Sequence, residues 1–187
     1  LNLTGVTLES GDSVPSRFVG AGVVSYGLDN IEIYGGTIRG YRHGVRIEGG
    51  RGHRIARVDV SGSRSQALRS TPDRYDEADI FHADTAELYG GGVLLKQTNG
   101  ATVVGVSARH AQNGIGLIGA RNTYVADNDV SENSGWGIHL WASSQNVVVR
   151  NKAHHNVRCE SPAYRRGCDS AGILLREQSD SNLVADN

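Results

Sequence analysis

The feature that most constrains the fold is a glycine followed by a short apolar alternation, which recurs along the whole chain. These glycines are Gly22, Gly44, Gly92, Gly114, Gly137 and Gly172, at intervals of 22, 48, 22, 23 and 35 residues. An apolar residue recurs eleven positions after each of them, at Ile33, Ile55, Val103, Val125, Val148 and Leu183. A further apolar residue recurs 16 positions after the first five of these glycines, at Ile38, Val60, Ala108, Val130 and Ala153. A fixed period of about 22 residues is typical of a solenoid.

Each repeat therefore carries three short strands separated by turns, with side chains pointing alternately inward and outward. One coil cannot bury its apolar face alone, so successive coils must stack and pair in parallel. The sequence predicts an all-β, single-stranded right-handed parallel β-helix with three short strands per coil. We expect residues 1–187 to form a single β-helix domain that belongs to a longer β-helix protein. Helical periodicity is absent from any segment of about ten residues, which excludes an α/β fold.

The charge balance excludes two classes of partner. Lys plus Arg number 19 and Asp plus Glu number 20, so the net charge is near zero and nothing suggests a nucleic-acid-binding arm or a polybasic membrane patch. No apolar run approaches the roughly 18 residues needed to span a bilayer. We therefore expect neither nucleic acid nor a membrane as partner.

Asparagine marks the turn between the second and third strands, at Asn128, Asn151 and Asn187. Asparagine tolerates the left-handed backbone conformation and can hydrogen-bond to the same side chain in the next coil. These three residues are interpreted as structural. A shorter series, Asn133 and Asn156, precedes the next strand glycine.

Two cysteines, Cys159 and Cys168, lie nine residues apart. A disulfide that closes a short loop is the preferred interpretation, and it would place the chain in an oxidising compartment, secreted or periplasmic. Two free thiols in a cytosolic protein are the alternative.

The pattern Gly-Ile-x-Leu, then Asn-x-Val, then Asn-x-Val-x-x-Asn resembles the repeats of the pectin-lyase-like right-handed β-helix superfamily. It is closest to the PbH1, NosD-type repeats of carbohydrate-binding and sugar-hydrolase proteins, and it covers the chain from Leu3 to Asn187. The resemblance is specific for the fold and not for an activity, because the superfamily includes lyases, epimerases, hydrolases and non-catalytic proteins.

Three coils contain inserted loops, over about 9–21, 61–91 and 154–171. All three enter the turn that precedes the glycine strand, whereas neutral drift would scatter insertions among the turns. Long loops on a rigid scaffold usually carry function. The resemblance implies that the glycine strand is the first sheet and that these loops wall a substrate groove along its outer face.

The second and fourth positions after each glycine point toward this groove. Trp141 and Tyr26 could stack on sugar rings, and Arg46 could pair with a uronate carboxylate. The candidate catalytic residues on the sheet are Lys96, His139 and Arg176, and the candidate substrate-binding residues are Trp141, Arg46, Tyr26 and Glu48. An ordinary solvated sheet face is the alternative.

The insertions add further candidates. The second is acidic, with Asp73, Asp76, Glu77, Asp79, His82 and Asp84. Asp79 and His82 are its catalytic candidates, and its carboxylates could instead hold Ca²⁺ or form a solvated loop. Arg165, in the third insertion, is a candidate contact for an anionic polymer. His154 and His155 are adjacent and should face opposite ways along a strand, which predicts a poor metal pair.

The preferred function is action on an acidic polysaccharide as a uronan lyase or C5-epimerase. A polygalacturonase-like hydrolase is a second possibility. Such enzymes use a pair of carboxylates, and Glu48 is the only carboxylate in the outer rows of the glycine strand, which argues against this function. A non-catalytic glycan-binding or structural module is a third. Copper handling of the NosD type is a fourth, and the absence of methionine and of a clustered ligand motif argues against a soft copper site.

Overall fold

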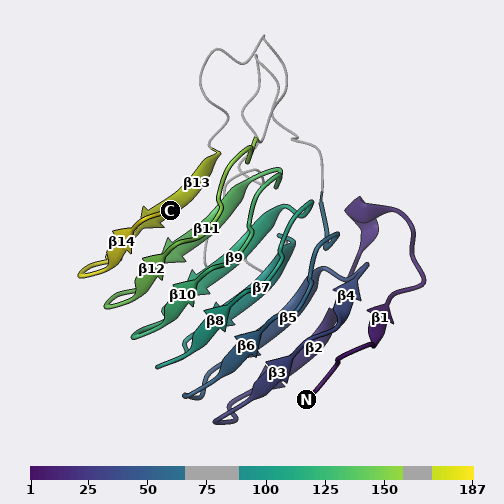
Figure 1. The fold of residues 1–187 in the computed structure, drawn as a ribbon, viewed down its shortest axis with the longest axis horizontal. Helices are drawn as coiled ribbons and strands as arrows, with labels where there is room; N and C mark the ends of the chain where they lie inside the picture. Colours follow the sequence, from purple (N-terminus) through teal and green to yellow (C-terminus); the bar gives the residue numbers. More distant parts are fainter. Residues whose placement is uncertain (66–88, 158–169) are drawn as a thin grey trace.

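The computed structural model describes residues 1–65, 89–157 and 170–187, which form a stack of parallel coils (Figure 1). The first sheet has six strands in the order β13-β11-β9-β7-β5-β2. Its strands are β2 (Ala21–Tyr26), β5 (His43–Glu48), β7 (Gly91–Lys96), β9 (Asn113–Ile118), β11 (Trp136–Trp141) and β13 (Ala171–Arg176). The second sheet follows the order β14-β12-β10-β8-β6-β3. Its strands are β3 (Glu32–Tyr34), β6 (Arg54–Ala56), β8 (Thr102–Val104), β10 (Tyr124–Ala126), β12 (Val147–Val149) and β14 (Leu183–Ala185). The all-β parallel β-helix predicted from the repeat is confirmed.

The predicted third strand is reduced in most coils to a single parallel bridge. Only β1 (Thr7–Glu9) and β4 (Thr37–Arg39) pair as a two-stranded ladder among the described residues. Elsewhere the bridges are Thr37–Asp59, Asp59–Ser107, Ser107–Asp129 and Asp129–Lys152. Positive φ at Asp127 and Glu132 bounds the third strand of one of these coils.

The inward positions of all coils form one continuous core. Its fully buried residues include Ile33, Ile55, Val103, Val125 and Val148 of the second sheet. The recurring glycine also faces inward: a Cβ at Gly114 would lie 2.5 Å from the carbonyl oxygen of Gly137 and 2.8 Å from the Cβ of Val130. The glycine recurs because the backbone approaches the core too closely at this position for any side chain.

The last coil departs from the predicted spacing by one residue. Val148 pairs with Val184, not with Leu183, and Leu183 is 56% exposed. Both Glu177 and Gln178 have positive φ, so the turn after β13 contains one residue more than the other coils. The prediction that Leu183 points inward is therefore wrong.

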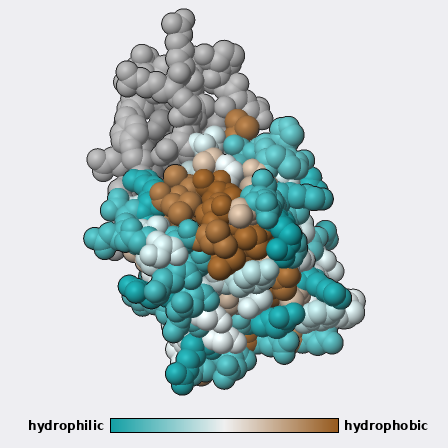
Figure 2. Space-filling view, turned by 60° about the vertical axis from the view of Figure 1, so that its left-hand side comes forward, coloured by the Kyte–Doolittle hydropathy of each residue, from teal (hydrophilic) through white to brown (hydrophobic). Residues whose placement is uncertain are grey.

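The end of the stack formed by β13 and β14 exposes apolar side chains. Figure 2, which turns this end toward the viewer, shows a hydrophobic patch bordered by hydrophilic residues. Leu175, Leu183 and Val184 are each at least 40% exposed. The described core is thus open to solvent at this end.

Asparagine side chains stack along the helix axis. The Nδ2 of Asn128 donates to the Oδ1 of Asn151 at 2.9 Å, and the Nδ2 of Asn151 donates to the Oδ1 of Asn187 at 2.8 Å. A second stack, which was not predicted from the sequence, joins Asn146 Nδ2 to Asn182 Oδ1 at 3.0 Å. Both stacks satisfy backbone groups at turns, where no strand partner exists.

Within the three described segments, no helix is long and apolar enough to cross a membrane. Their only helix is the single 3₁₀ turn η1 (Pro15–Arg17), which lies in the first inserted loop.

Candidate functional site

The first sheet brings seven predicted site residues onto one outer face. The register aligns Tyr26 with Glu48, Glu48 with Lys96, and Trp141 with Arg176. Arg46 and His139 occupy the adjacent row, two residues closer to the strand start. These residues therefore lie on neighbouring strands of one surface.

This face is not the open groove that the sequence predicted. Leu94 and His139 are only 4% and 1% exposed, and Ile118 is equally buried. A second apolar cluster, separate from the core, forms over the sheet from Tyr89, Leu94, Ile118 and Trp136. Large apolar side chains at outward positions have packed together, because apolar surface gains stability when it leaves water.

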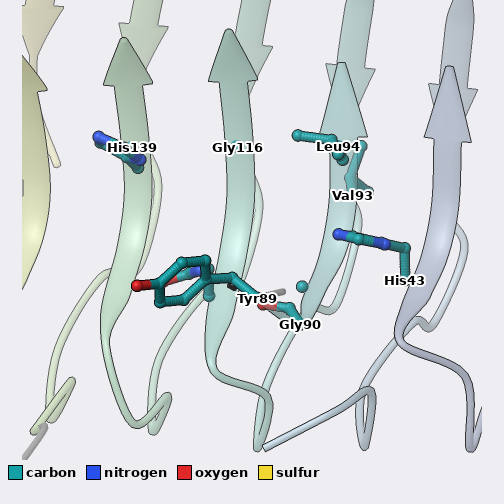
Figure 3. Close-up of a pocket in the computed structure, with 9 residues that line it drawn as sticks. His43, Tyr89, Gly90, Val93, Leu94, Gly116 and His139 are labelled. Carbon is teal, nitrogen blue, oxygen red and sulfur yellow. Dashed lines mark hydrogen bonds between the residues drawn. The ribbon is translucent and has the colours of Figure 1, made fainter. Parts of the chain in front are cut away.

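His139 lies within this cluster. Its ring centroid is 4.8 Å from that of Trp136 and 6.1 Å from that of Trp141. Figure 3 shows His139 and His43 on opposite sides of a small hollow, with Gly116 and Leu94 on the two strands between them and the Tyr89 ring nearby. A histidine in this position is sequestered from a polymer in solvent, in contrast to the proton carrier expected from the sequence.

The charged residues of the face already contact partners. Arg46 forms an ion pair with Glu48 on its own strand, its Nε donating to Oε1 at 2.6 Å. The guanidinium of Arg176 lies 5.1 Å from the centre of the Trp141 ring, a cation–π arrangement. Lys96, Trp141 and Arg176 are all partly exposed. The partly exposed residues of the face thus include Lys96, Trp141 and Arg176 of its fourth-position row.

Five predicted site residues lie outside the described residues. These are Asp79, His82, Arg165, Cys159 and Cys168. The roles assigned to them and the disulfide remain predictions.

The turn that precedes the first sheet brings two histidines together. The Nδ1 atoms of His154 and His155 lie 2.7 Å apart, both side chains are exposed, and their rings are perpendicular. The prediction that these neighbours face opposite ways is wrong, because His155 has a φ of 53°. Positive φ breaks the alternation of an extended strand, so the two imidazoles converge.

A hollow lies on the same side of the molecule as this turn. It is lined by Pro15 and Ser16 of the first inserted loop, by the described start of the second, and by neighbouring turn residues: Gly62, Ser63, Ser65, His110, Ala111, Glu132 and Ser134. The inserted loops were expected to wall a groove over the sheet. The described parts of the first and second loops instead border the hollow beside this turn.

A family model described as "Periplasmic copper-binding protein (NosD)" matches residues 6–187. The chain belongs to the NosD family. The predicted resemblance to NosD-type repeats is thereby confirmed, and this family is described as periplasmic. No curated protein and no solved structure matches the chain.

The NosD description raises the question of which residues could hold copper. In the described segments, no three His, Cys, Asp or Glu side chains come together as a metal site. His154 and His155 are the described pair that could supply two ligand nitrogens, because imidazole is a good copper ligand and their Nδ1 atoms lie within hydrogen-bond distance of each other. The acidic residues considered for Ca²⁺ lie outside the described part of the chain, and no finding supports Ca²⁺. A sequence signal for the pair existed: Gly40 and Gly62 occupy the equivalent turn position and mark it as left-handed.

Proposed function

We propose that this chain binds copper in the periplasm and that His154 and His155 hold the ion through their Nδ1 atoms. The observation that carries the proposal is the 2.7 Å separation of these two nitrogens. The family description supplies the metal and the compartment. Copper bound here would be cargo on an exposed surface, held by few protein ligands and therefore able to exchange.

The backbone of the turn holds the pair in place. The N–H of Glu132, in the preceding coil, donates to the carbonyl oxygen of His154 at 3.0 Å. The N–H of Val157 donates to the carbonyl oxygen of Asn133, also at 3.0 Å. The side chain of Asn156, which is buried, accepts from the N–H of Asn133 at 2.9 Å. Bonds on both sides of the histidines fix the backbone of the turn and keep the two side chains adjacent. The hydrogen bond between their Nδ1 atoms must open to admit a cation.

Changing both histidines to glutamine should weaken copper binding by about 100-fold or more, since losing even an outer-shell partner of a metal ligand typically costs about 10- to 100-fold. The measurement is titration of metal-free protein with Cu²⁺, followed by electron paramagnetic resonance to count bound imidazole nitrogens. Lys152→Gln, an exposed change two residues before the pair in the bridge that precedes the turn, is the matched control and should leave the affinity unchanged.

Two results would contradict the proposal. One is wild-type affinity in the His154→Gln/His155→Gln variant. The other is loss of copper from a Cys159→Ser/Cys168→Ser variant that keeps both histidines, which would assign the ion to the thiols.

A second candidate is binding of an acidic polysaccharide along the fourth-position row of the first sheet. The observation that favours it is the partly exposed Trp141 ring beneath Arg176, with Lys96 two strands away. Such a ring can stack on a sugar while the cations attract uronate groups. A lyase, an epimerase and a purely binding module would all use this surface.

Trp141→Ala should weaken binding of a uronan oligosaccharide by about ten-fold, the loss of one stacking contact of about 1 to 1.5 kcal/mol. The measurement is affinity electrophoresis with a panel of uronans, together with ultraviolet absorbance of the unsaturated product. A rise in absorbance supports a lyase, and new reducing ends without that rise support a hydrolase. Unchanged binding and turnover in both Trp141→Ala and Lys96→Ala would remove this candidate.

A further inference from the structure

Equivalent residues of successive coils form one row along the turn that enters the first sheet. The row consists of Gly40, Gly62, His110, Glu132 and His155, with φ values of 80°, 70°, 55°, 60° and 53°. Their intervals of 22, 48, 22 and 23 residues equal those between the strand glycines from Gly22 to Gly137. Positive φ is common in the turns of this chain, so it marks an equivalent position here rather than strain.

Backbone hydrogen bonds keep the row in register. The N–H of Gly62 donates to the carbonyl oxygen of Arg109 at 2.9 Å, and that of Glu132 donates to His154 at 3.0 Å. Adjacent parallel coils are about 4.8 Å apart. His110, Glu132 and His155 therefore stand one above another in three successive coils.

His110 and Glu132 already contact each other. The Nε2 of His110 lies 3.2 Å from the Oε2 of Glu132, with side-chain exposures of 60% and 38%. Both line the hollow walled by the first inserted loop, so water and ions can reach them. An imidazole nitrogen beside a carboxylate oxygen is a donor set that suits a divalent transition ion.

Arg109 competes with a cation for this pair. Its NH2 group donates to the Oε2 of Glu132 at 2.6 Å, and its Nε lies 4.0 Å from the Oδ1 of Asp129. Burial raises the pKa of Asp129, but hydrogen bonds from Ser131 and the charges of Arg109 and Lys152 together hold this pKa below its usual value. Asp129 therefore stays ionised at neutral pH and offers Arg109 a second partner if a metal ion takes Glu132.

We propose that His110 and Glu132 form a second copper station, one coil before the His154–His155 pair in the same row. This inference rests on the proposed function and extends it. The carboxylate makes the second station selective for the divalent ion, whereas the imidazole pair is less selective. Neighbouring two-ligand stations on an open turn suit a protein that passes its ion on.

The test is titration of the metal-free chain with Cu²⁺, with stoichiometry from calorimetry and nitrogen counts from electron paramagnetic resonance. Wild-type protein should bind two equivalents. His110→Gln and Glu132→Gln should each lose one equivalent and keep the two-nitrogen signal, whereas His154→Gln/His155→Gln should keep one equivalent with a one-nitrogen signal. Arg109→Gln should tighten the second station by about ten-fold, because it removes a competing charge.

Asp127→Asn is the matched control, since Asp127 is an exposed carboxylate paired with Arg150 in another turn. It should leave both equivalents in place. Two equivalents in His110→Gln, or unchanged affinity in both Glu132→Gln and Arg109→Gln, would overturn the second station while leaving copper binding intact. Failure of wild-type protein to bind copper would instead overturn the proposed function.

Discussion

Replacing Asn151 with alanine should lower the free energy of unfolding by about 3 to 5 kcal/mol, because it strands several buried polar groups at once. The Nδ2 of Asn151 donates to the carbonyl oxygens of Val125 and Val149 at 3.1 Å and to the Oδ1 of Asn187. Its Oδ1 accepts from both the backbone N–H and the Nδ2 of Asn128. Chemical denaturation followed by circular dichroism measures the loss.

Asn99→Ala is the control for the same chemical change. The Asn99 side chain is exposed and only accepts a hydrogen bond from Asn122, at 2.8 Å, so its loss should cost less than about 0.5 kcal/mol. Hydrogen exchange adds a local measure, because each coil depends mainly on its neighbours. The backbone N–H of Asn128 should exchange faster in Asn151→Ala. Equal stabilities of the two variants would show that the asparagine stack contributes nothing to the fold.

Gly114→Ala should be the second most damaging change, at about 2 to 4 kcal/mol. The added Cβ would meet the carbonyl oxygen of Gly137 at 2.5 Å and the Cβ of Val130 at 2.8 Å. Neither atom is the mobile end of a side chain, so two coils must separate locally and lose packing in the core. The shift in thermal midpoint, compared with wild type, measures the effect.

Gly116→Ala, two residues further along β9, is the matched control. A Cβ there would meet the Leu94 Cδ1 at 3.4 Å, the end of a flexible side chain, and it faces the hollow on the outer side of the sheet. Its effect should stay within about 0.5 kcal/mol. If Gly114→Ala proves as stable as Gly116→Ala, then close coil packing is not what the recurring glycine provides.

The site was harder to predict than the fold, for reasons visible in particular residues. Alternation correctly placed His139 and Leu94 on the outer side of the first sheet, yet an outer position is not always a solvated one. Trp136 and Tyr89 pack on that side and bury both. Sequence spacing shows the direction of a side chain, but its solvation depends on neighbours that are distant in the chain.

The His154–His155 pair is a second case in which the spacing of residues gave the wrong surroundings for a side chain. Strand alternation separates adjacent side chains, and one left-handed residue at His155 brings them together. The row of His110, Glu132 and His155, in contrast, follows the repeat, at intervals of 22 and 23 residues.

The sequence by itself determined the coil, its parallel stacking, the inward positions and the turn that receives the insertions, because a repeat must bury its apolar face against copies of itself. The tertiary structure decided that the third strand is reduced to single bridges in most coils and that part of the outer face of the first sheet is buried. It also brought His154 and His155 together, which the sequence indicated only through the glycines of the equivalent turn position. These outcomes depend on turn residues of positive φ and on packing between side chains of different coils. The spacing of the repeat shows neither of them.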